Sequence, residues 1–152
     1  MGITGAFLDT YAALGYNFVK CGEEARINLL SYNLAGGKMA KMRANINHAN
    51  KAGLTTHEYK PTEKTDKGIE AEMKAISEEW LRGKKSRELV FTVGGMGLSE
   101  PMDRRYFYAR DAKETMVAFN VFLPFGGMKG YYADVTRRLA KAPGGVTGKK
   151  QL

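Results

Sequence analysis

The sequence predicts an α+β fold in which helices flank a mainly antiparallel sheet. Apolar residues recur at helical spacing within two segments, 38–52 and 66–82. Three β-rich segments then follow one another closely at 106–110, 115–125 and 131–137, and the links between them have the composition of turns. Strands joined by short turns pair antiparallel, so the second half of the chain should form a meander.

The residues before these elements predict one short helix and one short strand. Phe7, Tyr11 and Leu14 recur at helical spacing. Gly15 ends this helix because glycine adopts the left-handed cap without steric cost. The apolar run at 16–20 indicates a short strand.

The segment 38–52 is predicted to be a helix that carries basic residues and no acidic residue. Its apolar stripe consists of Met39, Met42, Ile46 and Ala49, and its basic residues are Lys38, Lys41, Arg43 and Lys51. Exposed helices usually mix charges of both signs, because pairs four residues apart then stabilise the helix. Two interpretations stay open: a helix that faces phosphates, or a helix packed on its methionine stripe with a solvated basic back.

A strand and a second helix are predicted next along the chain. The segment 54–59 reads Leu-Thr-Thr-His-Glu-Tyr and ends before Pro61, which is typical of a strand. Asp66 is a suitable N-cap for a helix that runs to position 82. Its apolar face consists of Ile69, Met73, Ile76 and Trp80, of which the tryptophan is expected to anchor the core. The run at 90–93 indicates one further short strand.

Composition narrows the possible partners. The chain has 152 residues, and 24 Lys+Arg against 16 Asp+Glu give a net charge of +8, which attracts RNA or anionic phospholipid headgroups. The only cysteine, Cys21, excludes an internal disulfide, and with two histidines it argues against a structural zinc site. No apolar run reaches the ~20 residues needed to span a bilayer. No phosphate-binding glycine motif of a nucleotide site is present.

Asp134 and Arg137 lie three residues apart at the end of the last predicted strand. Ala-Pro-Gly-Gly-Val follows at 142–146, and residues 139–152 contain three lysines and no acidic residue. A transferase could use such a carboxylate and guanidinium to hold a cationic donor beside an anionic acceptor. From the spacing alone, an ordinary ion pair at a strand end is the simpler interpretation.

Several short motifs occur in a fixed order between Gly15 and Val146. They are Gly22-Glu23-Glu24-Ala25, Gly37-Lys38-Met39, Ala52-Gly53-Leu54, Ile76-Ser77-Glu78-Glu79-Trp80-Leu81, Val117-Ala118-Phe119, Asp134-x-x-Arg137 and Ala142-Pro143-Gly144-Gly145-Val146. Together they resemble the C-terminal catalytic domain of the phosphatidylglycerol lysyltransferases. These aminoacyl-phosphatidylglycerol synthases confer resistance to cationic antimicrobial peptides on bacteria.

The resemblance implies part of a tandem GNAT-like acyltransferase fold. Residues 1–35 would be the tail of a first GNAT unit, and 36–53 the basic connecting helix. Residues 54–152 would be the N-terminal half of a second, incomplete unit. The resemblance therefore also implies that the sequence is truncated at both ends relative to the family.

The resemblance further implies a reaction and a set of site residues. An aminoacyl group, usually lysyl or alanyl and here expected to be lysyl, would pass from aminoacyl-tRNA to a glycerol hydroxyl of phosphatidylglycerol. The reaction would take place at the cytoplasmic face of the bacterial plasma membrane, with no metal or other cofactor. Asp134 and Arg137, which match the family's Asp-x-x-Arg motif, would be the catalytic residues. Binding of tRNA or lipid phosphate would fall to Arg138, Lys141, Lys38, Lys41 and Arg43.

Two alternative functions stay open at this point. One is a Fem-type peptidoglycan aminoacyltransferase, which also uses aminoacyl-tRNA and paired GNAT folds; the Ile-Ser-Glu-Glu-Trp-Leu and Asp-x-x-Arg segments favour the lipid family over it. The other is a non-catalytic fragment that binds tRNA or an anionic membrane surface through its basic residues.

Overall fold

The computed structural model describes residues 5–23, 25–83, 95–127 and 129–146. The chain divides into two units, residues 1–33 and residues 34–152, and each is described by itself. The strand predicted at 90–93 lies outside the described residues. The domain boundaries implied by the family resemblance, at 35/36 and 53/54, stay predictions.

The first unit contains the predicted N-terminal helix. A turn of 3-10 helix, η1 (Gly5–Phe7), leads into α1 (Leu8–Ala13). The strand predicted at 16–20 is wrong, because this segment has no regular structure and Val19 is 85% exposed. A strand needs a neighbouring strand to satisfy its backbone groups, and none of the described residues pairs with this segment.

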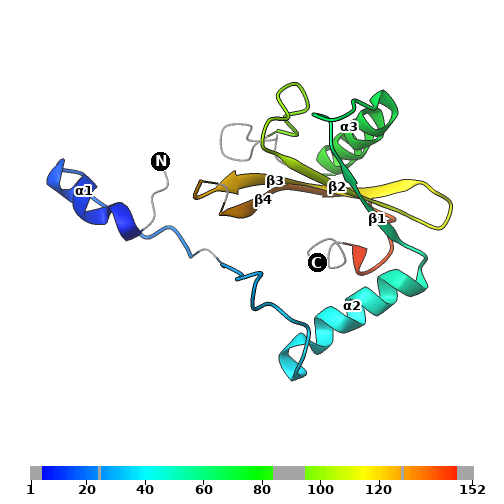
Figure 1. Cartoon of the computed structure of the whole chain (residues 1–152), viewed down its shortest axis with the longest axis horizontal. Helices are drawn as coiled ribbons and strands as arrows, with labels where there is room; N and C mark the ends of the chain where they lie inside the picture. Colours follow the sequence, from blue (N-terminus) through cyan, green and yellow to red (C-terminus); the bar gives the residue numbers. More distant parts are fainter. Residues whose placement is uncertain (1–4, 24, 84–94, 128, 147–152) are drawn as a thin grey trace. The chain divides into compact units, whose positions relative to one another are not determined.

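The second unit is built on one four-stranded antiparallel sheet (Figure 1). The strands β1 (Thr55–Tyr59), β2 (Arg105–Arg110), β3 (Met116–Phe125) and β4 (Gly130–Arg138) lie side by side in the order of the sequence. The predicted meander and the preceding strand are therefore confirmed. β3 and β4 are the longest strands, and they form the part of the sheet that carries Asp134 and Arg137.

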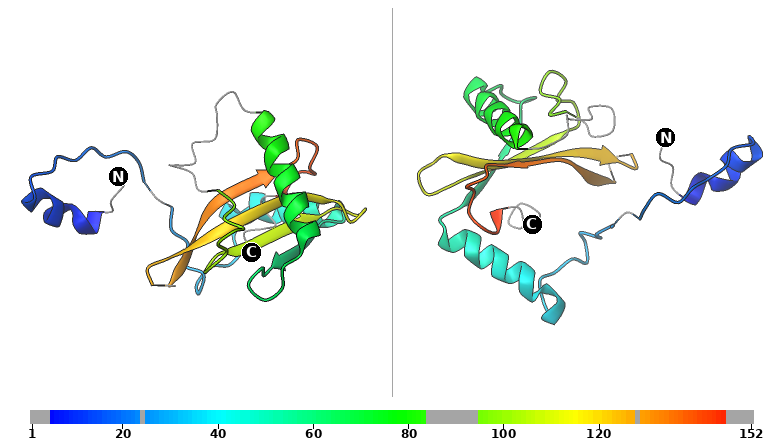
Figure 2. Two further views of the ribbon diagram at one scale, coloured as in Figure 1. Left: turned by 90° about the horizontal axis from the view of Figure 1, so that it is seen from above. Right: turned by 180° about the vertical axis from the view of Figure 1, so that it is seen from behind.

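The helix α3 (Lys67–Arg82) covers one face of this sheet (Figures 1 and 2). The side chain of Asp66 caps it by accepting hydrogen bonds from the backbone N–H groups of Gly68 and Ile69, at 2.9 and 3.2 Å. The core between helix and sheet consists of Tyr59, Met73, Ile76, Tyr106, Met116, Phe119, Val121 and Val135. The predicted apolar face of the helix is thus confirmed at Met73 and Ile76, which are buried, and at Ile69, which packs against this core.

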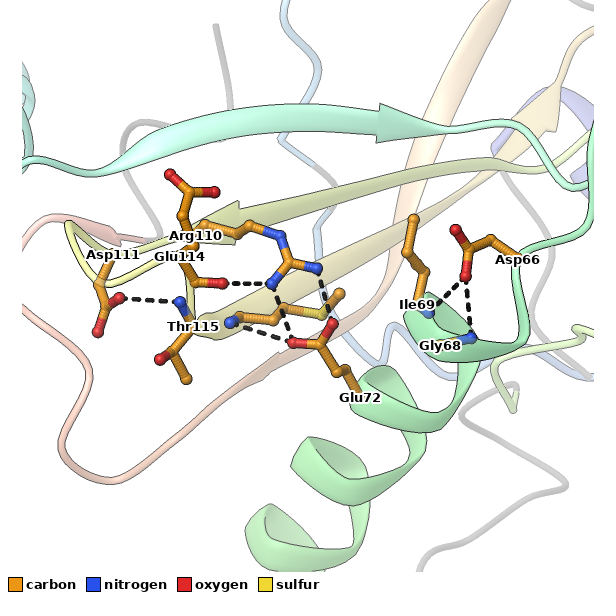
Figure 3. Close-up of polar contacts among 9 residues, drawn as sticks. Asp66, Gly68, Ile69, Glu72, Arg110, Asp111, Glu114 and Thr115 are labelled. Carbon is orange, nitrogen blue, oxygen red and sulfur yellow. Dashed lines mark hydrogen bonds and ion pairs between the residues drawn. The ribbon is translucent and has the colours of Figure 1, made fainter.

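A charged contact fixes α3 against the hairpin of β2 and β3 (Figure 3). The guanidinium of Arg110 donates two hydrogen bonds to the carboxylate of Glu72, from Nη2 to Oε1 at 2.7 Å and from Nη1 to Oε2 at 3.1 Å. The backbone N–H of Met116 adds a third bond to Glu72, at 3.3 Å. Two parallel hydrogen bonds fix both the distance and the relative orientation of the two side chains. They therefore help to hold α3 in a fixed position over the sheet.

On the opposite face of the sheet, the C-terminal end of α2 (Ala40–Lys51), which follows the 3-10 turn η2 (Gly37–Met39), packs together with the turn at 139–146 (Figures 1 and 2). The predicted helix at 38–52 is therefore confirmed. Ala49 and Val146, which are 0% and 1% exposed, belong to one apolar cluster beneath the sheet. Gly145 permits this packing: a Cβ there would lie 2.3 Å from the backbone oxygen of Asn45, and its φ of +82° is left-handed.

Candidate functional site

The pairing of β3 with β4 is interrupted at Asp134. Val121 lies opposite Val135 and Phe122 lies opposite Ala133, so Asp134 is the extra residue of a β-bulge. A bulge bends its strand and re-aims a side chain, and bulges are over-represented beside active sites. The sequence placed Asp134 near the end of a strand, and the structure adds this local irregularity.

Arg137 is held on the α3 side of the sheet. It lies opposite Phe119 of the core, and the residue is only 5% exposed. Its guanidinium carbon lies 3.8 Å from the centre of the Trp80 indole ring, a close cation–π contact. Stacking covers the flat face of a guanidinium, whereas its N–H donors lie in the plane of the group.

Among the residues that the structure describes, none forms an ion pair with Asp134. Its Oδ2 is buried and accepts no hydrogen bond. Within the described part of the chain, the ion pairs that the structure forms do not include one between Asp134 and Arg137, so the simpler interpretation of their spacing does not describe this structure. A buried carboxylate oxygen that lacks a donor is costly in an apolar setting, which makes it a candidate for contact with a substrate.

The basic residues after Arg137 differ from it in exposure, and Arg138 also lies on the other face of the sheet. Arg138 lies opposite Ala118, which belongs to the apolar cluster on the sheet face away from α3. Because side chains alternate along a strand, Arg138 points to that same face. Arg138 and Lys141 are both exposed. The structure thus separates the two neighbouring arginines: one is buried under a helix, and the other is available at the surface.

The predicted cations of η2 and α2 differ in the contacts that they make. Lys38 and Lys41 are exposed. Arg43 is exposed too, but its Nη1 donates hydrogen bonds to the backbone oxygens of Leu34 and of Gly36, the latter at 2.8 Å. These bonds tie the chain that enters the helix to the helix itself, so Arg43 has a local structural role beside the binding role predicted for it.

Sequence reasoning did not assign a role to Asn120 and assigned Trp80 to the core alone. Asn120 is 2% exposed, lies in the middle of β3 opposite Phe107 and Thr136, and its Oδ1 accepts no hydrogen bond. The signal was present, because an asparagine interrupts an otherwise apolar strand. Trp80 is only half-buried, and its ring faces a charge.

The described ranges also bear on metal binding and on membrane-spanning helices. No group of three or more His, Cys, Asp and Glu side chains there is placed to hold a metal ion. None of the helices there is both long enough and apolar enough to traverse a lipid bilayer.

The fold and these residues define an α+β domain with a bulged strand, a stacked arginine and exposed basic residues at the end of β4, in the turn after it and in η2 and α2. The family model described as phosphatidylglycerol lysyltransferase, C-terminal, matches residues 1–148 of the chain. The chain belongs to this family, as the motifs indicated.

Curated relatives agree with this assignment. The phosphatidylglycerol lysyltransferase of Bacillus subtilis is 34% identical over 136 residues, which is 90% of this chain and 15% of that protein. The enzyme of the same name from Staphylococcus xylosus is 29% identical over 80% of this chain and 14% of its own length. The lysylphosphatidylglycerol biosynthesis bifunctional protein of Mycobacterium marinum is 25% identical over 96% and 13%. The chain therefore spans about one seventh of the curated relatives it matches.

Solved structures confirm the fold. The structure of L-PGS from Bacillus licheniformis superposes with a TM-score of 0.82 at 26% identity, and covers 97% of this chain and 46% of that one. The C-terminal domain of a lysylphosphatidylglycerol synthetase from Agrobacterium fabrum also gives a TM-score of 0.82, at 25% identity, over 96% and 45%. The predicted α+β, GNAT-like class with an antiparallel sheet and flanking helices is confirmed.

Proposed function

We propose that this chain carries part of the active site of an enzyme that transfers a lysyl group from lysyl-tRNA to phosphatidylglycerol. The observation that carries the proposal is the family match over residues 1–148. The names of these relatives indicate lysine as the transferred amino acid and phosphatidylglycerol as the acceptor lipid. The tRNA donor is our inference, supported by the net charge of +8 and by the exposed lysines of η2 and α2.

The proposed chemistry is an exchange of esters. A glycerol hydroxyl oxygen of the lipid attacks the aminoacyl carbonyl carbon, and a new C–O bond forms while the bond to the tRNA ribose oxygen breaks. The proton lost by the glycerol hydroxyl is returned to the ribose oxygen. Because one ester replaces another, catalysis rests on positioning and charge stabilisation. We propose that no metal or cofactor takes part.

Asp134 is the residue proposed to act on the reacting groups. A carboxylate with a buried oxygen that lacks a hydrogen-bond donor is suited to one of two tasks. It could hold the α-ammonium of the donor, or it could accept the proton of the glycerol hydroxyl. The bulge at this position supports either role, because it directs the carboxylate away from the regular pleat.

Arg137 is proposed to bind the phosphate of the lipid headgroup. A guanidinium matches two phosphate oxygens with parallel N–H donors, which a lysine ammonium does not. Its stacking at 3.8 Å on Trp80 restrains the orientation of the plane before the lipid arrives. Preorganisation of this kind lowers the entropic cost of binding.

Four exposed cations are proposed to bind the tRNA backbone or the anionic membrane surface. Arg138, Lys141, Lys38 and Lys41 supply this charge. Contacts between such side chains and phosphates release counterions, so binding should weaken steeply with salt. Because tRNA is cytoplasmic, we place the reaction at the cytoplasmic face of the plasma membrane.

Transfer of labelled lysine tests the proposal directly. The full-length protein is incubated with lysyl-tRNA and phosphatidylglycerol vesicles, and labelled lipid is separated by chromatography. Asp134→Asn should reduce the turnover by about 100-fold or more, a loss typical of removing a general base or a charged ligand. Asp9→Asn, a change at an exposed carboxylate of α1, is the matched control and should leave turnover unchanged.

Each outcome of this assay has a distinct meaning. Wild-type turnover in Asp134→Asn would refute the role proposed for this carboxylate. Binding of tRNA without any transfer to lipid would instead favour the non-catalytic alternative, which the short span of the chain relative to its relatives keeps as a second candidate. The Fem-type alternative is not favoured by any relative reported above.

A further inference from the structure

The hairpin of β3 and β4 projects beyond the rest of the sheet (Figure 1). The pairing of β2 with β3 ends at Phe122, opposite Arg105, whereas the pairing of β3 with β4 continues to Phe125. Residues 123–125 and 130–132 therefore form a two-stranded extension of the sheet. A two-stranded ribbon cannot bury both of its faces by itself, so its side chains indicate the medium that it meets.

The extension carries exposed aromatic side chains. Among the described residues of the second unit, the exposed large apolar side chains are those of Met102, Phe125 and Tyr132. The last two belong to the extension and are 48% and 58% exposed. They lie on one face, because Leu123 pairs with Tyr132 and side chains alternate along a strand. The Phe125 ring lies across β4 at Gly130, where a Cβ would be 2.5 Å from it, so the glycine allows the ring to stay on this face.

The charge of this segment selects among the partners that an apolar surface could have. Residues 123–133 contain one charged residue, Lys129, which is exposed, and no acidic residue. Aromatic rings beside a lysine are typical of segments at a bilayer interface, where the rings enter the headgroup region and the ammonium stays among anionic headgroups. A nucleic acid is a poorer match, because one cation neutralises little of a phosphate backbone.

The same strand leads from the extension to the candidate catalytic residues. Tyr132 precedes Asp134 and Arg137 on β4. At about 3.3 Å per residue, the two residues lie at most roughly 7 and 17 Å further along the strand. A hairpin end held among the headgroups would therefore bring the bulge close to a lipid that stays in its bilayer.

We propose that the end of the β3–β4 hairpin is a membrane-contact site, at which Phe125 and Tyr132 enter the interface of a bilayer that contains phosphatidylglycerol and Lys129 lies among its headgroups. This inference deepens the proposed function and rests on it for the identity of the lipid. The contact holds the enzyme at the surface where its lipid substrate lies.

Fluorescence quenching by lipids with brominated acyl chains tests the contact in the full-length protein without any transfer reaction. Phe125→Trp places an indole at the hairpin end, and its signal is the difference between this variant and the parent protein. Vesicles of brominated phosphatidylglycerol should quench this signal and shift its emission to shorter wavelength. Lys113→Trp, at an exposed position in the turn between β2 and β3, is the matched control and should be neither quenched nor shifted. Absence of quenching at position 125 would overturn the proposal.

Two other occupants of this surface would give different results in the same experiment. Packing against a second copy of the chain would shift the Phe125→Trp emission with protein concentration before any vesicle is added. Packing against another part of the protein would give a short-wavelength emission that vesicles do not change. Either result would overturn the membrane contact.

A variant with Phe125→Ser and Tyr132→Ser measures the consequence for the reaction. It should raise the KM for phosphatidylglycerol in vesicles about 10-fold or more, because it removes two side chains that would leave water. Turnover of a short-chain phosphatidylglycerol dissolved as monomers should stay unchanged, and so should the thermal midpoint, since both side chains are exposed. Equal losses with the two forms of the lipid would overturn the proposal.

The two experiments together separate this inference from the proposed function. Quenching at position 125 in a protein that transfers no lysine to phosphatidylglycerol supports the membrane contact and refutes the reaction. Transfer of lysine to the lipid without quenching at position 125 refutes the membrane contact and leaves the reaction standing.

Discussion

The contact between Trp80 and Arg137 gives the sharpest test of the arrangement on the α3 face. The guanidinium carbon is 3.8 Å from the indole centre, and Arg137 is 5% exposed. A cation–π contact in a desolvated setting contributes about 2 kcal/mol or more, against roughly 0.5–1 kcal/mol at exposed sites. Because each 1.4 kcal/mol is about tenfold, the contact corresponds to roughly 30-fold in an equilibrium constant.

The perturbation must separate the charge contact from simple loss of packing. Trp80→Leu removes the π face and also leaves a cavity, which by itself destabilises the fold. We therefore expect Trp80→Leu in the wild-type background to lower the free energy of unfolding by more than it does in an Arg137→Met background. The difference, the coupling energy of the double-mutant cycle, should be about 2 kcal/mol.

Urea unfolding of the four proteins in the cycle measures this coupling, and the lipid transfer assay measures its consequence for function. Trp80→Phe keeps an aromatic face and should lose less activity than Trp80→Leu. Ile76→Val, a change in the same helix at a site buried in the core, should cost about 0.5–1.5 kcal/mol of stability and leave turnover unchanged. A coupling energy near zero would refute the argument that the indole holds the guanidinium.

Two further predictions concern parts of the fold that support the site. Gly145→Ala should destabilise the domain by more than ~1 kcal/mol in thermal unfolding, since the added Cβ would meet the Asn45 oxygen and the left-handed φ alone costs about that much; Gly144→Ala, with open space around it, should be nearly neutral. Arg105 donates a hydrogen bond to Glu58 and lowers the pKa of that carboxyl below its ordinary value of 4.5. A lowered folded-state pKa stabilises the fold above pH 4.5, and this part is lost as the pH falls through the folded value. Glu58→Gln should therefore flatten the acid side of the stability profile, by less than about 1 kcal/mol for a partly exposed pair, and an unaltered profile would contradict this.

The elements with strong periodicity were predictable. α3 has four apolar residues at spacings of four, three and four, together with an N-cap that the structure confirms. The strands of the meander are separated by turns of unambiguous composition. The segment at 16–20 looked like a strand because its residues favour one, but strand propensity mostly reflects packing against neighbours. Among the described residues no strand lies beside 16–20, so the strand propensity of this segment is not supported by any packing.

The site was predictable only in part. The motif pointed to Asp134 and Arg137. Spacing along a strand predicts which sheet face a side chain lies on only where the side chains alternate regularly, and the bulge at Asp134 interrupts this alternation. The contact of Arg137 with Trp80 joins residues 57 positions apart, which no local pattern can reveal. The unsatisfied amide oxygen of Asn120 became visible only once its burial was known.

The distribution of satisfied and unsatisfied groups over the sheet supports a functional seam between β3 and β4. Near the β2–β3 hairpin, the carboxylate of Glu72 accepts hydrogen bonds from Arg110 and from a backbone N–H. Both of its oxygens are therefore hydrogen-bonded within the fold. Along the seam, by contrast, Asn120 and Asp134 each bury an oxygen that accepts nothing, and the ladder itself is irregular. Each of these features lowers stability, and local rules of this kind are broken mainly where function requires it. A substrate that brings an N–H donor to Asp134 would supply the hydrogen bond that the fold does not, and for this reason we propose that the contact with substrate lies at the bulge and not at the Glu72 end of the sheet.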